Sequence, residues 1–317
     1  MLVLRADPWL PEYGMGFDVA IDEEPPEHVD PFVETDDWSR GLPGAPRAAV
    51  LWFVDGVRRI ELRVQASDGR RTGPGVFGSY AVGSVESNGH ARFGLHEVRR
   101  AVVIGGGVQA EPVAVGALEF APQCDSALDS NGLLLCLQSL MRGLEVRLAE
   151  AIAGEAGRLV LADGPLGHNL YNVQTTSPVV GVVKRSLREY LGTVPSASEL
   201  LAALPPGHRT PLFVIGDETA RTRRFSWYVR ITARRAPLHD RSGLVRCELR
   251  YADGLETARA VADHVAAVLP VFAGRPWDAR TPQNVAPIAA LEQWLRHRMG
   301  DTRLVRRALL QWMSQAA

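Results

Sequence analysis

The chain has 317 residues, of which 46% are hydrophobic and 22% charged, and its formal net charge is −1 at pH 7. This composition excludes a wholly disordered or histone-like protein and supplies enough apolar residues for a sizeable core. The mean hydropathy is −0.04, and the sequence contains no apolar run long enough to cross a membrane. Arg5 and Asp7 stand where a signal peptide needs apolar residues, and the three cysteines are widely spaced. We therefore expect a cytoplasmic protein with reduced thiols.

An acidic stretch lies near the start of the chain. Residues 22–37 hold many Asp and Glu side chains and three prolines, but no Arg or Lys. Such a stretch is typical of an exposed segment. We therefore predict that residues 1–47 form an N-terminal extension with an extended acidic arm, and that residues 48–317 form the main domain.

Hydrophobic periodicity predicts the elements of the first half. Residues 48–54 and 58–64 have strand patterns, and the Asp-Gly dipeptide between them is a turn signal. Residues 67–90 are rich in Gly and Ser and are predicted to be a loop. Two more strands are expected at residues 101–104 and 113–120, and a helix at 131–153.

In the second half, strands alternate with helices. Strands are predicted at residues 158–162, 178–183, 212–215, 226–232 and 244–251, and helices near 185–204 and at 256–271, 285–298 and 302–314. Strands that come first and then alternate with helices favour an α/β domain with a mixed sheet. The last helix carries Leu304, Leu309, Leu310, Trp312 and Met313, which could pack on the domain itself or dock a partner.

Three carboxylates are candidates for a metal site. Asp55 and Asp163 each follow an apolar run and precede a glycine. Each pair could simply be a turn, but strand ends are also where sites form in α/β sheets. On the helix between them, Glu145 falls at the border of the apolar stripe, whereas Glu150 points to solvent. Three convergent carboxylates favour Mn²⁺ or Mg²⁺, and such ions catalyse phosphodiester hydrolysis.

Lysine usage singles out one more residue. Of the 35 Lys and Arg residues only Lys184 is a lysine, and it follows the apolar run 178–183. Chance in an Arg-rich chain would explain this. Alternatively, the position needs a compact ammonium group, which could bind a phosphate beside the carboxylates.

A basic segment, residues 221–250, interleaves nine arginines with aromatic residues. Basic and aromatic side chains together can bind nucleic acid, and Arg221, Arg223, Arg224 and Arg230 are the candidates. The alternative is a strand pair with one solvated arginine face and one buried aromatic face.

Five segments together resemble the NurA nuclease family. They are FVDG (53–56), RGLE (142–145), LVLADGPL (159–166), VVGVVKRS (179–186) and PQNVAPIAALEQWL (282–295). The resemblance implies an RNase H-like fold with N-terminal and C-terminal elaborations. It also implies a Mn²⁺-stimulated or Mg²⁺-stimulated DNA exonuclease, with 5′-to-3′ polarity and possible endonuclease activity, that works in end resection and double-strand break repair.

The same resemblance assigns partners and site residues. It implies a homodimer docked on a HerA-type hexameric ATPase. Asp55, Glu145 and Asp163 match the family's metal carboxylates, and Lys184 matches the Lys of its GVVK segment. The sequence departs from the family near its C-terminus, where Thr281 replaces a Tyr and Ala289 stands near an expected His. Gln283 or Asn284 is therefore the expected fourth ligand, and we favour Asn284. If no fourth ligand exists, the alternative is a non-catalytic subunit that binds DNA or the ATPase.

Overall fold

The computed structural model describes residues 2–6, 28–127, 129–166, 174–184, 189–217, 222–233, 241–274 and 285–316. The strands are β1 (Val3–Ala6), β2 (Val29–Asp30), β3 (Leu42–Pro43), β4 (Val50–Ser67), β5 (Thr72–Ser87), β6 (Ala91–Ile104), β7 (Val113–Val115), β8 (Leu118–Cys124), β9 (Arg158–Asp163), β10 (Val179–Val183), β11 (His208–Arg209), β12 (Phe213–Ile215), β13 (Arg224–Arg230) and β14 (Leu244–Arg250). The helices are α1 (Ser130–Ala153), α2 (Ala197–Ala203), α3 (Leu255–Val268), α4 (Ala286–Arg298) and α5 (Thr302–Ala316), with two 3₁₀ turns, η2 (Tyr251–Asp253) and η3 (Leu269–Phe272).

The described strands form one mixed sheet. Its main path runs β2-β12-β13-β14-β10-β9-β4-β5-β6-β8-β7. At the centre, β4, β5 and β6 pair antiparallel, and β9 and β10 then continue the sheet parallel to β4. Three antiparallel strands followed by a helix and two parallel strands form the predicted RNase H-like arrangement. The prediction of a mixed α/β sheet flanked by helices is confirmed.

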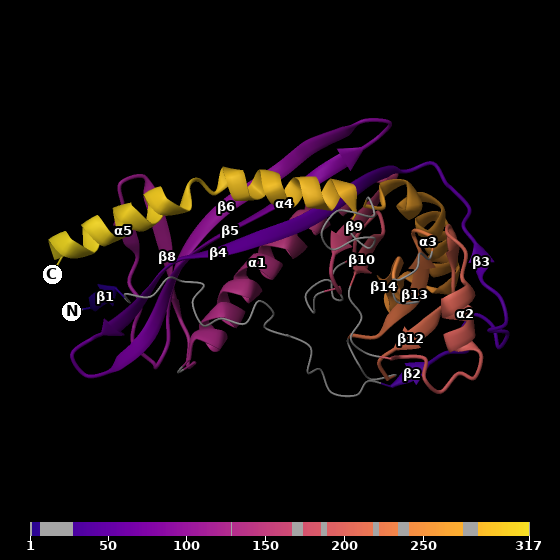
Figure 1. Ribbon diagram of the computed structural model, residues 1–317, viewed down its shortest axis with the longest axis horizontal. Helices are drawn as coiled ribbons and strands as arrows, with labels where there is room; N and C mark the ends of the chain where they lie inside the picture. The colour runs from indigo at the N-terminus through magenta and orange to yellow at the C-terminus, as the bar shows by residue number, and fades with distance from the viewer. Residues whose placement is uncertain are drawn as a thin grey trace.

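Helices cover both faces of this sheet (Figure 1). A side chain at Gly78 would overlap Leu137 of α1, whereas one at Gly83 would contact Leu291 and Leu295 of α4. Since these two glycines of β5 point to opposite faces, α1 and α4 lie on opposite sides of the sheet. Figure 1 shows α4 and α5 following the long strands, with α2 and α3 at the other end of the molecule. None of the helices in the described part of the chain meets the length and hydropathy needed to cross a membrane.

The predicted turn at Asp55 and Gly56 is wrong. Both residues lie inside β4, a single strand of 18 residues, and they pair with Gly83 and Val82 of β5. The glycine serves close packing instead of a turn. A Cβ at position 56 would overlap the Glu145 carboxylate and touch Met141 of α1. Glycine inside a strand commonly marks such a close approach.

The predicted loop at residues 67–90 is also wrong, because most of it forms β5. Its glycines let neighbouring elements pack closely, as Gly78 does for α1 and Gly83 for α4. Most of the other predicted elements are confirmed within a few residues. The strand predicted at 101–104 is the end of the longer β6, and the one predicted at 113–120 is the hairpin of β7 and β8. The helix near 185–204 is helical only over α2, Ala197–Ala203, while residues 185–188 lie outside the described part.

The C-terminal helix packs on its own domain. Val305, Leu309 and Met313 of α5 are buried in a cluster that includes Leu62 and Phe77. The opposite face leaves Leu304 66% exposed. Of the two alternatives for this helix, packing on its own domain or docking a partner, the first therefore holds for the buried face.

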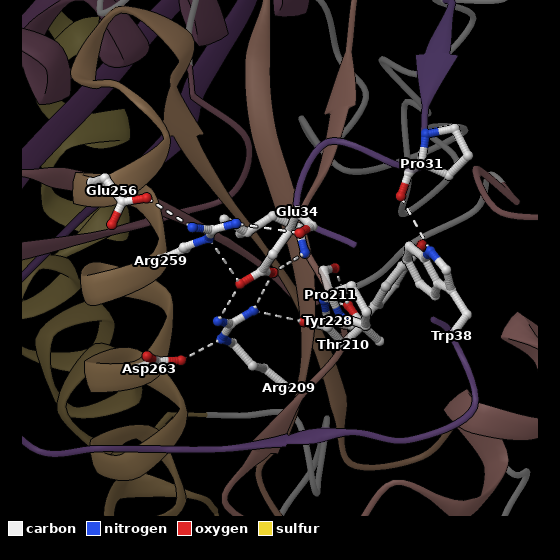
Figure 2. A network of polar contacts seen from close by, with 11 residues as sticks. Pro31, Glu34, Trp38, Arg209, Thr210, Pro211, Tyr228, Glu256, Arg259 and Asp263 are labelled. Atoms are coloured by element: carbon white, nitrogen blue, oxygen red, sulfur yellow. Dashed lines mark hydrogen bonds and ion pairs between the residues drawn. The ribbon is translucent and has the colours of Figure 1, made fainter. Parts of the chain in front are cut away.

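The described part of the acidic segment is docked instead of forming a free arm. Strand β2 pairs with β12, and β3 pairs with β11. Between them Glu34, with its side chain only 8% exposed, accepts two hydrogen bonds from Arg209, at 2.8 and 2.9 Å. It also accepts one from the Leu212 backbone N–H at 2.7 Å, and Arg209 reaches Asp263 as well (Figure 2). The exposed arm predicted for 22–37 is thus wrong for Glu34, and residues 22–27 lie outside the described part.

We expect Glu34→Gln to lower the free energy of unfolding by about 3 kcal/mol, because it removes the more deeply buried of the two carboxylates that pair with the buried Arg209. Burial alone would raise the pKa of Glu34, but the hydrogen bonds and charge of Arg209 outweigh it and lower the pKa. This stabilisation is therefore present above the ordinary pKa of a glutamate and is lost as the pH falls through the lowered value.

Urea denaturation at neutral and acidic pH measures this difference. Glu256→Gln is the matched control, since Glu256 pairs with Arg259 but is 86% exposed, and it should cost under about 0.5 kcal/mol. Equal stability losses for the two variants would show that the Glu34 network contributes no more than a surface pair.

Candidate functional site

Asp55 and Asp163 lie side by side on neighbouring parallel strands. Val54 of β4 is in register with Ala162 of β9, so the next residue of each strand is also in register. Since side chains alternate between the two faces of a sheet, both carboxylates project from the same face. Phe53 and Leu161, two residues earlier, belong to the core cluster under α3 and α4 on that face. The two aspartates therefore point toward the side covered by α4.

Glu292 of α4 completes a group of three carboxylates. Asp55, Asp163 and Glu292 each offer an oxygen, and these oxygens all lie within 4.8 Å of one another. Sequence reasoning missed Glu292 and placed the fourth ligand at Gln283 or Asn284, which lie outside the described residues. One signal could have found it: Glu292 is the sole carboxylate of α4 and lies about one turn after Ala289.

Glu145 approaches from the opposite side of the sheet. It belongs to α1, and its carboxylate occupies the space over Gly56 that a side chain would fill. It is 7% exposed, so it is more deeply buried than the border position predicted. Glu145 is not part of the group within 4.8 Å, although its charge acts on Asp55. Glu150, predicted to point to solvent, is only partly exposed.

Three cations neutralise part of this charge. Lys184 Nζ lies 2.9 Å from Asp163 Oδ1, as expected for a lysine just beyond β10. Arg142 donates to Glu145 Oε2 at 2.8 Å and to the Asp163 backbone carbonyl at 2.9 Å. Arg296 also lies 3.9 Å from Glu292, so four carboxylates (−4) against these three cations (+3) leave a formal charge of −1 among the described residues if all seven groups are ionised. The site is therefore acidic overall.

The pKa values reflect this crowding. Burial raises the pKa of Asp55 well above its usual range, the charges of Asp163 and Glu145 raise it further, and Lys184 opposes them. Burial also raises the pKa of Glu145, against the opposing effect of Arg142. A protonated carboxylic acid or a bound cation would relieve the repulsion.

Unpartnered oxygens favour a cation. Asp55 Oδ2 and Glu145 Oε1 are buried and have no hydrogen-bond partner among the residues that the structure describes. Buried acceptors are normally satisfied, so these two atoms need a ligand. A set of carboxylate oxygens suits Mg²⁺ or Mn²⁺ better than softer metals. The residues present therefore fit a divalent ion bound between β4, β9 and α4.

The structure contradicts a DNA-contacting role for two of the predicted arginines. Arg224 is 4% exposed and Arg230 1% exposed, so neither can reach a phosphate outside the protein. Arg230 donates instead to the backbone carbonyls of Leu201 and Leu204. Arg223 lies 3.9 Å from the ring centre of Tyr251, and Arg221 lies outside the described residues. The alternative of a solvated arginine face also fails for β13, because every residue of this strand is buried.

These buried arginines support the metal site indirectly. Arg224 Nε donates to Glu248 at 2.9 Å, and Arg246 also pairs with it. The other oxygen of Glu248 accepts from the Leu166 backbone N–H at 3.0 Å, three residues after Asp163. Charges and hydrogen bonds from both arginines outweigh burial and lower the pKa of Glu248. Glu248 thus stays ionised and holds the segment that follows Asp163.

We expect Asp55→Asn to raise the melting temperature of the metal-free protein at pH 7 by about 2 °C or more, because it removes a buried charge. A raised pKa favours the folded state at low pH, and this advantage is lost as the pH rises through the folded-state value. The difference between variant and wild type should therefore shrink on acidification. Thermal melts in EDTA at several pH values test this, and a destabilised variant at every pH would contradict it.

Comparisons with known proteins find only distant similarity. No protein-family model matches the chain, and no curated protein matches it. Among solved structures, Ciona intestinalis endonuclease V, in complex with a 24mer DNA containing an inosine followed by a ribo-adenosine, is 11% identical. The match covers 80% of this chain and 87% of that one, with a TM-score of 0.36. A NurA structure is 18% identical over 42% of this chain and 23% of its own, with a TM-score of 0.22. Neither similarity assigns the chain to a family.

Proposed function

We propose that the chain is a divalent-metal-dependent deoxyribonuclease that hydrolyses phosphodiester bonds. The observation that carries this proposal is the carboxylate group Asp55, Asp163 and Glu292, whose oxygens lie within 4.8 Å of one another, with a buried oxygen on Asp55 that has no hydrogen-bond partner in the described part of the chain. Carboxylate clusters of this kind bind the ions that assist phosphoryl displacement. In the central part of the sheet β9 pairs in parallel with β4, so Asp163 and Asp55 are neighbours.

Each residue has a role in this proposal. Asp55, Asp163 and Glu292 hold the metal, and Glu145 supplies a further oxygen from α1. In this position Mn²⁺ or Mg²⁺ would supply charge stabilisation for the phosphoryl group during displacement and would activate a water molecule. Lys184 Nζ, 2.9 Å from Asp163, is within reach of a phosphate oxygen placed beside that carboxylate. Arg142 orients Glu145 through the hydrogen bond at 2.8 Å.

The family and partners belong to the same proposal. The segments FVDG, LVLADGPL and VVGVVKRS support a NurA-like nuclease that forms a homodimer on a HerA-like hexameric ATPase. In such an assembly the motor would feed DNA to the metal site during 5′-to-3′ end resection in double-strand break repair. The rival proposal, a non-catalytic subunit, rested on a missing fourth ligand. Glu292 supplies a candidate for that ligand and favours the nuclease.

We expect Asp163→Asn and Glu292→Gln each to lower the cleavage rate of linear DNA by about 100-fold or more, because each removes a metal ligand. Gel assays on labelled duplex and single-stranded DNA, with Mn²⁺, Mg²⁺ or EDTA, measure this. Glu150→Gln is the control and should retain near-normal activity. If Glu292→Gln were active and Glu145→Gln inactive, the metal ligands would be Asp55, Glu145 and Asp163, as predicted from the sequence.

Lys184 gives a separate test. Lys184→Ala should lower cleavage at least about 10-fold, because it removes a positive charge near the reacting phosphate. Lys184→Arg should restore little, since the planar guanidinium differs from the ammonium in size and in donor geometry. The rate at saturating metal is the measurement. Full activity of Lys184→Arg would mean that charge alone matters at this position.

A further inference from the structure

A group of aromatic and basic side chains lies between β6 and α4. Phe93 and Trp294 stack with nearly parallel rings, 3° apart, with their centres separated by 4.6 Å. His96 contacts the same indole edge-on at 4.6 Å. Arg298 lies 5.7 Å from the indole centre and donates to His96 Nε2 at 3.2 Å. We call Phe93, His96, Trp294 and Arg298 the aromatic patch.

Phe93 presents a free ring surface. It is 46% exposed even though Trp294 covers one of its faces. The exposure therefore comes from the outer face and the ring edges. Leaving this much apolar surface in water forgoes the free energy that burial would provide, so it indicates a binding surface more than a core contact. The indole of Trp294 holds the phenyl ring in a fixed orientation, and a third planar group could stack on the outer face of that ring.

The charge around the patch is positive. Arg92, Arg296 and Arg298 are exposed on the two elements that form it, and of these Arg296 also lies 3.9 Å from Glu292. The nearby carboxylate of Glu97 is already paired with Arg99, at 2.5 Å. Aromatic rings flanked by cations bind single-stranded nucleic acid, because bases stack on the rings while the cations attract the phosphates. These arginines would not strengthen the binding of an uncharged partner.

The patch is close to the carboxylate group. Across the sheet, Asp55 pairs with Gly83, and Gly83 pairs with His96. Two strand spacings correspond to about 10 Å. Helix α4 contributes to both places, through Glu292 and Trp294. A DNA strand with a phosphate at Asp55 therefore has neighbouring nucleotides within reach of Phe93.

We infer that the aromatic patch binds an unpaired base of the substrate DNA strand by stacking it on the outer face of Phe93. The inference rests on the proposed nuclease function for its choice of DNA. It adds a substrate class, because only a single-stranded segment offers a free base face; bases inside a duplex are already stacked. The site thus selects frayed or single-stranded DNA next to the cleavage point.

Fluorescence anisotropy with a labelled oligo-dT strand in EDTA tests the inference without cleavage. Phe93→Leu keeps an apolar side chain but removes the ring, and it should weaken binding about 5-fold or more. Phe93→Tyr should bind like wild type, because it keeps the ring. Leu95→Ala is the matched control, since Leu95 is 59% exposed on the same strand but offers no aromatic face. Blunt duplex of equal length should bind all variants alike.

The outcomes separate this inference from the proposed function. Binding of oligo-dT and its cleavage are measured separately, so a wild-type protein that binds oligo-dT but never cuts it would overturn the nuclease alone. Wild-type affinity of Phe93→Leu would overturn stacking. Equal losses for Phe93→Leu and Leu95→Ala would overturn it too. A change of molecular mass in light scattering for Phe93→Leu would reassign the patch to a protein interface.

Discussion

Repulsion among buried carboxylates is the constraint on which the site depends. Asp55 and Asp163 are adjacent because β4 and β9 run parallel in register, and α4 brings Glu292 to the same face. Burial and these neighbouring charges raise the pKa of Asp55, and Lys184 and Arg142 neutralise only part of the charge. A protein that keeps such a costly arrangement gains from it when a cation binds, which links the fold to metal-dependent chemistry.

Glycines and buried ion pairs hold the elements in the positions that the site requires. Gly56 leaves the space that the Glu145 carboxylate occupies, and Gly83 lets α4 approach the sheet. On the other side, Glu248 ties the segment after Asp163 to the arginines of β13 and β14. Helices α1 and α4 and strands β13 and β14 thus act together on two short stretches of β4 and β9. Activity in this account depends on packing by residues that are not themselves metal ligands.

Part of this arrangement could be predicted from sequence. The apolar runs before Asp55 and Asp163 predicted two strands whose aspartates contribute to one site, and the rarity of lysine pointed to Lys184, which does pair with Asp163. The turn at Asp55 was wrong because Asp-Gly is a local signal, while the need for Gly56 arises from α1. Glu292 was missed because the face that α4 turns to the sheet is a tertiary property. Arg224 looked solvent-facing because its partner Glu248 lies on another strand.

Metal binding by the carboxylate group is the central claim, and anomalous diffraction from crystals soaked in Mn²⁺ tests it most directly. The account predicts a manganese peak in contact with carboxylate oxygens of Asp55, Asp163 and Glu292, and no such peak in Asp55→Asn crystals. A soaked crystal with no manganese at this position, or with manganese bound only elsewhere, would contradict the account.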